Sequence, residues 1–508
     1  MNYLEHMSPH GPTWSPKPSD HRQVFQEQNP WWQEGRVPTV LAPAAERPLA
    51  RCLYRRLLHD APRRFQLILG PRRVGKTTVM YQTVQHLLDS GCPPRRLLWL
   101  RLDHPLLMLQ PLGELVRAAI DGSGATAESP LYLFLDELTY AADWDLWLKT
   151  FYDEAWPVRL TGTSSSTAAL RNRRVESGVG RWEEQYLAPY LFGEFLDLAG
   201  HPVSVPVESS LARTLEAAAR AVDADATLAG FRRRFLLTGG FPEILLGSAS
   251  QTDEESALLQ SQRILRSDAV ERAIYKDIPQ AFGLESPMLL ERLLYTLAGQ
   301  VTGVLSPTTL SQTLGGMSQP TFDRYLAYLE RAFLVFTVPN YSGTEASRQR
   351  RGRKLYFVDS AVRNAALQRG IAPLHDAAEM GVLTENLVAG HLHALSQQSA
   401  VRLYHWRDRN DEVDLIYDHP EEPLAIEIGL SHTHHRAGLQ RFMERCPRFH
   451  GRCYLAAPSA PTLLPGDAHD HVGTIPLDVL LLAVSAQTAR ELALRIGAPP
   501  AAPPPAST

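Results

Sequence analysis

A phosphate-binding loop determines the fold class of this chain. The apolar run 65–69 leads directly into Gly70-Pro-Arg-Arg-Val-Gly-Lys-Thr77, which has the spacing Gly-x-x-x-x-Gly-Lys-Thr. In such a loop the glycines let the backbone curl, so that its N–H groups converge on a phosphate at the N-terminus of a helix. The sequence therefore predicts a strand, a phosphate loop and a helix in succession, which is typical of an α/β fold with a parallel sheet.

The residue types within the loop predict how a nucleotide binds. Lys76 is expected to reach the β- and γ-phosphates, and the Thr77 hydroxyl to bind Mg²⁺. Only five of the 51 basic residues are lysines, and one of them stands at position 76. A compact ammonium fits beside the phosphates where a planar guanidinium does not. The expected nucleotide-binding residues are Gly70, Pro71, Arg72, Arg73, Val74, Gly75, Lys76, Thr77 and Thr78.

A second nucleotide signature follows about 60 residues later, in Leu131-Tyr-Leu-Phe-Leu-Asp-Glu137. Asp136, at the end of the expected strand, is predicted to hold the Mg²⁺ shell. Glu137 is predicted to orient and deprotonate the attacking water. Alone, an Asp-Glu pair could equally cap a helix, but its position after a phosphate loop favours the catalytic interpretation.

The next expected strand leads into Thr161-Gly-Thr-Ser-Ser-Ser166. A polar side chain placed there can sense the γ-phosphate, and Thr163 and Ser164 are the candidates. The alternative for each residue is a hydroxyl-rich turn that caps a helix.

Composition limits the partners and the compartment. The net charge of −4 gives no global attraction to nucleic acid or to an anionic membrane, so any such binding must come from local patches. The four cysteines lack metal-type spacing, which suits a reducing cytoplasm; Cys446 and Cys453 could pair, but buried thiols are the simpler expectation. We find neither a signal peptide nor a membrane-spanning run, so the sequence predicts a cytoplasmic protein.

Several motifs together resemble one protein family. They are the phosphate loop, Leu135-Asp-Glu137, Thr161–Ser166, Gly180-Arg181, Pro189-Tyr-Leu-Phe-Gly-Glu-Phe195, Gly239-Gly-Phe-Pro-Glu243, Tyr275-Lys-Asp-Ile278 and Tyr356-Phe-Val-Asp359. As a set they resemble the prokaryotic AAA-type ATPases with a C-terminal restriction-endonuclease-like domain of unknown function. The resemblance covers most of residues 46–445 and implies ATP rather than GTP as the nucleotide, with Mg²⁺ as its cofactor.

The resemblance also implies an arginine finger. In such ATPases an arginine after the sensor strand acts on the γ-phosphate, often from a neighbouring subunit, and Arg181 matches that place. Where the arginine comes from a neighbouring subunit, the partner is a second copy of the chain in a homo-oligomer. The alternative is that Arg181 forms a structural ion pair, since arginine is abundant in this chain.

The pattern along the chain, read with this resemblance, predicts six segments. They are a flexible N-terminal arm (1–45), an AAA-type P-loop ATPase core with a parallel sheet (46–200), a helical lid (201–285), a winged-helix module (286–360), a restriction-endonuclease-like α/β domain (361–490) and a disordered tail (491–508).

The predicted winged-helix module suggests contact with nucleic acid. Two helices with Ser-Pro or Ser-x-Pro starts precede two strands and a basic loop, Arg348-Gln-Arg-Arg-Gly-Arg-Lys354. Its charges could neutralise several phosphates of DNA, an interaction that salt would weaken steeply. The alternatives are a protein-packing module and a solvated loop. The expected nucleic-acid contacts are Arg348, Arg350, Arg351, Arg353 and Lys354, with Gln319, Thr321 and Arg324 near the bases.

The C-terminal unit carries three acids on a helix and two strands. Glu385, Asp414 and Glu427 make a plausible oxygen-ligand set for Mg²⁺, which would polarise a phosphodiester and activate water. The arrangement resembles the PD-(D/E)xK nuclease core, with one departure. The lysine expected two residues after Glu427 is Gly429, and no lysine follows Lys354. His432, Arg436 or Gln440 could take that role.

Two functions remain open from the sequence. The first is an ATPase that hydrolyses ATP, with Glu137, Lys76 and Arg181 as catalytic residues, to switch a DNA-associated winged-helix and nuclease-like module. The second is a nucleotide-switched binding scaffold whose C-terminal nuclease fold is catalytically degenerate. Gly429 favours the second for cleavage and says nothing about ATP.

Overall fold

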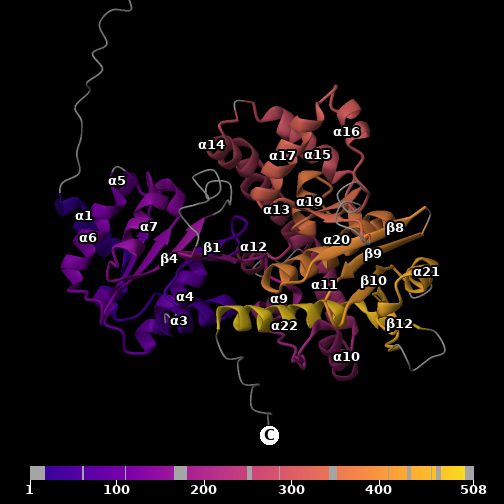
Figure 1. Ribbon diagram of the computed structural model, residues 1–508, viewed down its shortest axis with the longest axis horizontal. Coiled ribbons are helices and arrows are strands. Elements are labelled where there is room, and N and C mark those ends of the chain that lie inside the picture. The colour runs from indigo at the N-terminus through magenta and orange to yellow at the C-terminus, as the bar shows by residue number, and fades with distance from the viewer. Residues whose placement is uncertain are drawn as a thin grey trace, which may run out of the picture.

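The computed structural model describes residues 18–59, 62–108, 110–164, 180–248, 254–284, 286–342, 352–409, 411–431, 436–458, 460–464 and 471–497. An N-terminal lobe holds a parallel sheet, helices form the centre and top, and a second sheet lies at the opposite end (Figure 1). The last helix, α22, runs between the two lobes and packs on helices of both.

The ATPase core is a five-stranded parallel sheet. Its strands are β1 (Phe65–Leu69), β2 (Leu97–Arg101), β3 (Leu131–Asp136), β4 (Val158–Ser164) and β5 (Trp182–Tyr186), in the order β2-β3-β4-β1-β5. The four strands from β1 to β4 are almost wholly buried because helices cover both faces, which explains the continuous apolar runs of β2 and β3. The predicted parallel α/β core is therefore present. Its helical segments are α3 (Pro48–His59), α4 (Lys76–Asp89), η1 (Pro94–Arg96), α5 (Pro105–Met108), α6 (Leu112–Ser123), η2 (Leu138–Tyr140) and α7 (Trp144–Asp153).

The N-terminal residues from 18 onward are folded, which differs from the expectation of a flexible arm over 1–45. Helices α1 (Pro18–Gln28) and α2 (Trp31–Glu34) lie against the edge strand β2. The indole N–H groups of Trp31 and Trp32 both donate to the carbonyl of Leu97, and the Asn29 amide donates to the carbonyl of Trp99. These side chains anchor the segment because a buried tryptophan both removes apolar area from water and finds a partner for its N–H group.

Helices connect the core to the rest of the molecule. They are α9 (Phe192–Leu198), α10 (Leu211–Ala221), α11 (Ala226–Thr238), α12 (Pro242–Ser248), α13 (Glu254–Leu265), the π-helical segments η4 (Arg266–Glu271) and η5 (Ala273–Asp277), and α14 (Ile278–Phe282). π-Helical turns are rare and are found frequently at functional sites. Here they face the phosphate loop, because Arg72 and Arg73 contact Asp277 and Asp268. We refer to the described residues 239–248 and 254–277 as the lid, a shorter segment than the helical lid expected over 201–285.

Three helices and a two-stranded antiparallel sheet follow the lid. They are α15 (Met288–Ala298), α16 (Pro307–Thr313), α17 (Gln319–Arg331), β6 (Val335–Pro339) and β7 (Arg353–Phe357). The expected helix starts are present: the Ser306 and Ser318 hydroxyls accept hydrogen bonds from the backbone three residues on. We call residues 288–357 the helix–hairpin unit.

The C-terminal unit is a second five-stranded sheet with helices. Its strands are β8 (Leu403–Asp408), β9 (Asp411–Tyr417), β10 (Leu424–Ile428), β11 (Cys453–Ala457) and β12 (Val472–Pro476), in the order β12-β11-β10-β9-β8. β8, β9 and β10 pair antiparallel, and β10, β11 and β12 pair parallel. The helical segments are α19 (Ser360–Ala366), η6 (Ala372–His375), α20 (Ala377–Gln398), α21 (Ala437–Arg445), η7 (Pro447–Phe449) and α22 (Leu477–Ile496).

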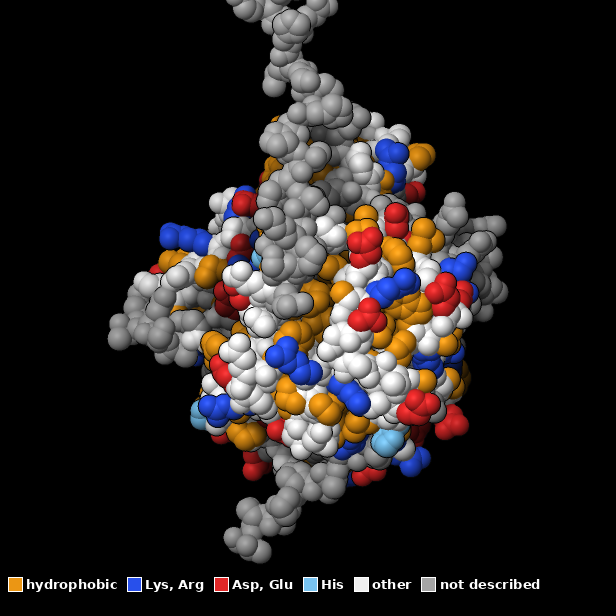
Figure 2. Space-filling view, turned by 90° about the vertical axis from the view of Figure 1, so that its left-hand side faces the viewer, with side chains coloured by type: hydrophobic (Ala, Val, Ile, Leu, Met, Phe, Trp, Pro, Cys, Tyr) orange, Lys and Arg blue, Asp and Glu red, His pale blue; other side chains and the backbone are white. Residues whose placement is uncertain are grey.

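Surface charge, cysteine pairing and helix apolarity were the remaining general properties predicted from the sequence. On the end face formed by the ATPase core, basic and acidic side chains are intermixed among those of described residues (Figure 2). The four cysteines are free thiols, so Cys446 and Cys453 are not paired. Across the described ranges, no helix combines the length and the apolarity that a membrane span requires.

Candidate nucleotide site and the carboxylate cluster around Lys354

The phosphate loop joins β1 to α4 and requires its glycines. A Cβ on Gly70 would lie 2.1 Å from the carbonyl oxygen of Leu187, so only glycine lets the two backbones approach. Gly75 has φ +91° and precedes the first residue of α4, a conformation that side chains other than glycine rarely adopt. The N-terminus of α4 and its free N–H groups therefore point into the loop, as anion binding requires.

Lys76 is buried within the loop. Its ammonium donates to the carbonyls of Gly70 at 3.0 Å and Pro71 at 2.8 Å. Burial lowers the pKa of Lys76 to about 8, and the nearby Glu137 and Asp136 carboxylates counteract part of that effect. A desolvated ammonium at this position is suited to phosphate oxygens, which would satisfy its charge better than carbonyl groups do.

A chain of hydrogen bonds links the loop to the ends of β3 and β4. The Thr77 hydroxyl donates to Asp136 Oδ2 at 3.0 Å, and the Thr163 hydroxyl donates to Asp136 Oδ1 at 2.6 Å. Thr163 Oγ1 also accepts from the backbone N–H of Glu137 at 3.0 Å, which holds Glu137 in a left-handed conformation with φ +53°. The sequence predicted all four residues, and the structure brings them together beside Lys76.

The donor set fits one hard cation next to a phosphate. Asp136 and Thr77 present a carboxylate and a hydroxyl oxygen, which are ligands that Mg²⁺ prefers. Burial raises the pKa of Asp136 to about 6, and the hydrogen bonds from Thr163 and Thr77 counteract part of that effect by favouring the carboxylate. Bound there, Mg²⁺ would neutralise negative charge on the nucleotide phosphates.

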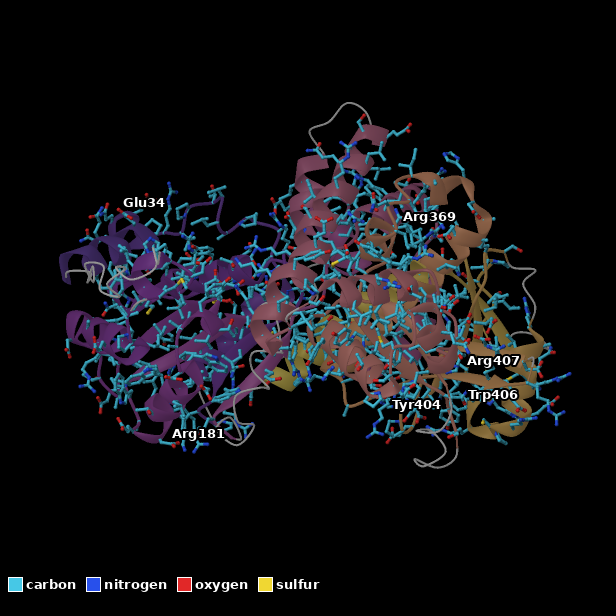
Figure 3. The ribbon with its side chains drawn as sticks, turned by 90° about the horizontal axis from the view of Figure 1, so that it is seen from above. Glu34, Arg181, Arg369, Tyr404, Trp406 and Arg407 are labelled. Carbon is cyan, nitrogen blue, oxygen red and sulfur yellow. The ribbon has the colours of Figure 1, made fainter. Side chains whose placement is uncertain are left out.

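Ser164 and Arg181 occupy different positions relative to the loop. Ser164 is the last residue of β4, at the carboxyl ends of the strands where the phosphate loop also lies, and is 2% exposed. The Arg181 carbonyl accepts from the N–H of Phe65, at the start of β1, so Arg181 lies at the opposite, amino ends of the strands. Its guanidinium pairs with Asp153 at 2.7 and 3.0 Å, at the periphery of the core (Figure 3). Within one chain, Arg181 therefore cannot reach the loop.

Arg47 is a site residue that the sequence did not reveal. Its guanidinium, which is 4% exposed, pairs with both carboxylate oxygens of Glu194 at 3.0 and 2.9 Å. The same group donates to the carbonyls of Val74, in the phosphate loop, and Ala188, and lies 4.2 Å over the ring of Tyr190. Arg47 thus fixes the back of the loop against the segment 188–194.

The two loop arginines contact carboxylates of the lid. Arg72 pairs with Asp277 through two hydrogen bonds, one of them 2.6 Å between Nη2 and Oδ1. Arg73 pairs with Asp268 at 2.7 Å and with Glu243 at the start of α12. Arg72 and Asp277 are 205 positions apart, and Arg73 and Glu243 are 170 positions apart. No local sequence pattern could therefore predict these contacts.

The lid is in turn attached to the C-terminal unit through Asp359. The Asp359 carboxylate accepts from the N–H groups of Gly240 and Ala361, both at 2.8 Å. A Cβ on Gly240 would lie 2.3 Å from the carbonyl oxygen of Tyr190, so glycine is required where the lid crosses the ATPase core. The motifs around positions 190, 240 and 359 therefore form one junction.

Two of the three predicted C-terminal acids contact a buried lysine, and the third, Glu427, contacts the backbone of Asp414. Lys354, from β7, is 1% exposed, and its ammonium lies 3.1 Å from Glu385 Oε1 and 3.0 Å from Asp414 Oδ1. It also pairs with Glu412. The Glu427 carboxylate accepts from the backbone N–H of Asp414 at 3.3 Å, and Asp414 Oδ2 accepts from that of Ile428 at 3.0 Å. We call these five side chains the Lys354 cluster.

The cluster shifts the ionisation of its members. Burial, together with the Asp414 carboxylate, raises the pKa of Glu385 to about 8. Burial alone would lower the pKa of Lys354, but the surrounding carboxylates, Asp414 foremost, hold it well above its usual range. Glu385 and Asp414 thus have a cation beside them, the Lys354 ammonium, as buried acids require.

Three expectations for this region are corrected. Lys354 is not a nucleic-acid contact, because it is buried in the cluster; Arg353, next to it, is exposed. A lysine does lie beside the acids, where we had named His432, Arg436 or Gln440 for that role, and it is Lys354 from β7. Among described residues, no group of three or more His, Cys, Asp or Glu side chains is arranged to hold a metal ion, which includes the expected set Glu385, Asp414 and Glu427. Arg348, Arg350, Arg351 and His432 lie outside the described residues.

Comparisons with known proteins support the ATPase assignment of the N-terminal part. Residues 62–196 match the model of an AAA domain, and residues 231–371 and 380–463 match two domains of unknown function, DUF8612 and DUF4143. The match and the loop geometry identify an AAA-type P-loop ATPase domain.

Curated relatives share most of the chain. An uncharacterized protein of Methanocaldococcus jannaschii is 24% identical over 379 residues, which cover 73% of this chain and 76% of that protein. An uncharacterized protein of Haemophilus influenzae is 22% identical, with 72% and 82% covered. Among solved structures, the Walker-type ATPase PABY2304 of Pyrococcus abyssi is 15% identical with a TM-score of 0.37, covering 62% of this chain and 94% of that one. The Aeropyrum pernix ORC1 protein in complex with DNA is 15% identical with a TM-score of 0.30, covering 66% and 97%.

Proposed function

We propose that this protein binds and hydrolyses ATP, and that the nucleotide switches a binding module formed by the helix–hairpin and C-terminal units. The proposal is supported by the hydrogen bonds that link Thr77, Asp136, Thr163 and Glu137. They hold a cation-binding pair and a candidate carboxylate base beside the buried Lys76. These are the groups that phosphoryl transfer to water needs: charge stabilisation, metal binding and orientation of the attacking water.

The residues divide the work as follows. The loop N–H groups and Lys76 bind the phosphates, and Thr77 with Asp136 holds Mg²⁺. Glu137 accepts a proton from the water that attacks the γ-phosphate, and Thr163 fixes its backbone at the end of β3. The products are ADP and inorganic phosphate. Arg181 could contribute only from a second copy of the chain.

ATP hydrolysis is tested by phosphate release with the wild type, Glu137→Gln and Lys76→Ala, each with Mg²⁺. We expect Glu137→Gln to bind ATP like the wild type and to lose nearly all turnover. Lys76→Ala should lose binding as well. Turnover that persists in Glu137→Gln would contradict the assignment of the base, and absence of ATP binding by the wild type would contradict the proposal as a whole.

For the helix–hairpin unit, we propose that the partner is double-stranded DNA. Gln319 and Arg324 are exposed on α17, and Arg353 is exposed at the start of β7; Arg350 and Arg351, which precede it in the sequence, lie outside the described residues. We expect replacement of Arg350, Arg351 and Arg353 by alanine to weaken binding of labelled DNA at low salt. Equal affinity in the triple variant would exclude the loop as the contact.

For the C-terminal unit, the Lys354 cluster supports a binding role rather than cleavage. The ammonium lies between Glu385 and Asp414, where a divalent ion would have to sit to engage both carboxylates. We therefore expect no Mg²⁺- or Mn²⁺-dependent cleavage of single- or double-stranded DNA, with or without ATP. Cleavage by the wild type that disappears in Asp414→Ala would overturn the scaffold and establish a nuclease for which Lys354 supplies the lysine missing at Gly429.

A further inference from the structure

Two positively charged side chains of the phosphate loop are engaged by negatively charged side chains of the lid. Arg72 lies at the second variable position of the loop, and its guanidinium forms a two-point contact with the Asp277 carboxylate. Both side chains are largely buried, at 15% and 9% exposure. A planar, two-point pair of this kind is among the stronger polar contacts in proteins.

Arg73 forms a second, more exposed contact with the lid. It pairs with Asp268 at 2.7 Å and with Glu243. The side-chain exposures are 36% for Arg73, 25% for Asp268 and 63% for Glu243. Solvent screens this contact more than the first, so we expect it to be weaker.

The lid carboxylates also act on the phosphate site itself. Asp277 is one of the charges that influence the pKa of Lys76, so it lies within electrostatic reach of the lysine that would bind the β- and γ-phosphates. The triphosphate of ATP is an anion of high charge, and its binding brings it to the same loop. Phosphate oxygens and carboxylate oxygens accept hydrogen bonds from the same N–H groups of arginine, with the same planar two-point geometry.

We propose that Asp277, assisted by Asp268 and Glu243, competes with the nucleotide phosphates for the loop arginines and thereby sets the affinity for ATP. The inference rests on the proposed function, since it concerns the same nucleotide site. When the triphosphate engages Arg72 and Arg73, the three lid carboxylates lose their partners, and the lid is released from the loop.

Release of the lid has a defined route to the rest of the molecule. Glu243 lies in the first turn of α12, and the N–H of Gly240, three residues earlier, donates to Asp359 at 2.8 Å. Asp359 comes shortly after the end of β7 and is the N-cap residue of α19, since its carboxylate accepts from the N–H of Ala361. A shift of the lid therefore acts on the start of the C-terminal unit, close in sequence to the strand that carries Lys354. The arginine–carboxylate pairs connect nucleotide binding to that junction.

The test is the affinity for a fluorescent ATP, N-methylanthraniloyl-ATP, measured by titration with the full-length protein and Mg²⁺. Because a competing contact reduces the fraction of protein that is competent to bind, Asp277→Asn should lower the apparent Kd by about tenfold. The Arg72→Ala variant should bind more weakly than the wild type. In the double variant the Asp277→Asn gain should vanish, because its target is gone.

Matched variants separate competition from a general change in the lid. Glu271→Gln is the control, since Glu271 lies in the same π-helical region and pairs with Arg266 rather than with the loop. It should leave the Kd unchanged. If Asp277→Asn fails to fold, as judged by circular dichroism, Asp268→Asn replaces it, with a smaller expected gain because its partner Arg73 is more exposed.

A second measurement follows the lid directly. Hydrogen exchange of the backbone amides in 266–277 should accelerate when the wild type binds ATP, and the acceleration should be absent in the Lys76→Ala variant. Unchanged or weaker binding by folded Asp277→Asn would overturn this inference alone, as would unchanged exchange in a wild type that binds ATP. A wild type that binds no nucleotide would instead overturn the proposed function together with it.

Discussion

The Lys354 ammonium on β7 lies 3.0 Å from the Asp414 carboxylate on β9. The pair joins the helix–hairpin unit to the C-terminal sheet across 60 residues of sequence. Glu385 on α20 contacts the same ammonium, so three elements meet at one buried charge. Removal of one partner from such a group leaves buried charges uncompensated, and this makes Lys354 a sensitive probe of how the two units are held together.

We predict that Lys354→Met lowers the free energy of unfolding by about 3–5 kcal/mol, because it leaves Asp414 and Glu385 buried without their cation. Chemical denaturation monitored by circular dichroism measures the loss. Arg353→Met is the control, since Arg353 is adjacent but exposed, and should change stability by less than about 0.5 kcal/mol. Equal stability of the two variants would show that the cluster does not hold the units together.

The residues proposed for nucleotide binding could be located from the sequence because they belong to local patterns. A loop between a strand and a helix, and acids at the end of the next strand, can be located from spacing and apolar runs alone. Their meeting point follows, since the carboxyl ends of parallel strands lie at one edge of the sheet. Lys76, Thr77, Asp136 and Thr163 are therefore found where the pattern indicated.

The sequence did not predict contacts between distant segments. Lys354 belongs by position to a basic loop, and only the paired strands β6 and β7 turn it inward toward acids of another unit. Arg47 precedes the core and has no motif of its own, yet it holds the phosphate loop. Trp31 and Trp32 stood out as an anchor in a polar, proline-rich segment, but nothing in the sequence indicated their shared partner, the carbonyl of Leu97. In each case the partner lies too far along the chain for periodicity to reveal it.

We predict that Thr163→Val lowers kcat by about a hundredfold with little change in ATP affinity, because misplacement of a catalytic group far outweighs the loss of one contact. The Thr163 hydroxyl joins Asp136 to the backbone of Glu137, so its loss removes one hydrogen bond from each, while Asp136 keeps the one from Thr77. Thr161→Val is the matched control on the same strand, since the Thr161 hydroxyl is buried without a hydrogen-bond partner. Equal turnover of the two variants would contradict the role given to Thr163.

Arg47 should act on ATP binding through the shape of the loop. Arg47→Lys keeps the charge but loses the planar two-point contact with Glu194, and a single ammonium cannot also satisfy the carbonyls of Val74 and Ala188. We expect KM for ATP to rise about tenfold while kcat falls less, since the loss of positioning affects the bound phosphates first. Steady-state kinetics measure the split. An unchanged KM would show that the loop keeps its shape without Arg47.

Arg181→Ala distinguishes a structural ion pair from an arginine finger. Arg181 pairs with Asp153 near the amino ends of the strands, whereas the phosphate loop lies at their carboxyl ends. We therefore expect unchanged turnover at low protein concentration and a stability change below about 1 kcal/mol. The measurement is phosphate release over a range of protein concentrations. Loss of turnover that appears only at high concentration would instead show that Arg181 acts on a neighbouring copy of the chain.

His391 should make the stability of the protein depend on pH. Its imidazole is buried on α20; Nδ1–H donates to the Leu387 carbonyl, and Nε2 accepts from the N–H of Phe192 on α9. Burial lowers the pKa of His391 from 6.5 to about 4. The neutral form is therefore favoured in the folded state, so the contribution to stability is complete above pH 6.5 and is lost as the pH falls from 6.5 to about 4.

A shift of this size corresponds to about 3 kcal/mol, which His391→Gln should remove from the pH dependence of the unfolding free energy. Glutamine keeps one donor and one acceptor but does not titrate in this range. Denaturation between pH 4 and 8 measures the difference, with His201→Gln as an exposed control that should leave the profile unchanged. Because His393 and His405 are also buried with pKa values of about 4, part of the acid sensitivity should remain. A profile in His391→Gln identical to that of the wild type would mean that the contact between α20 and α9 does not require a neutral imidazole.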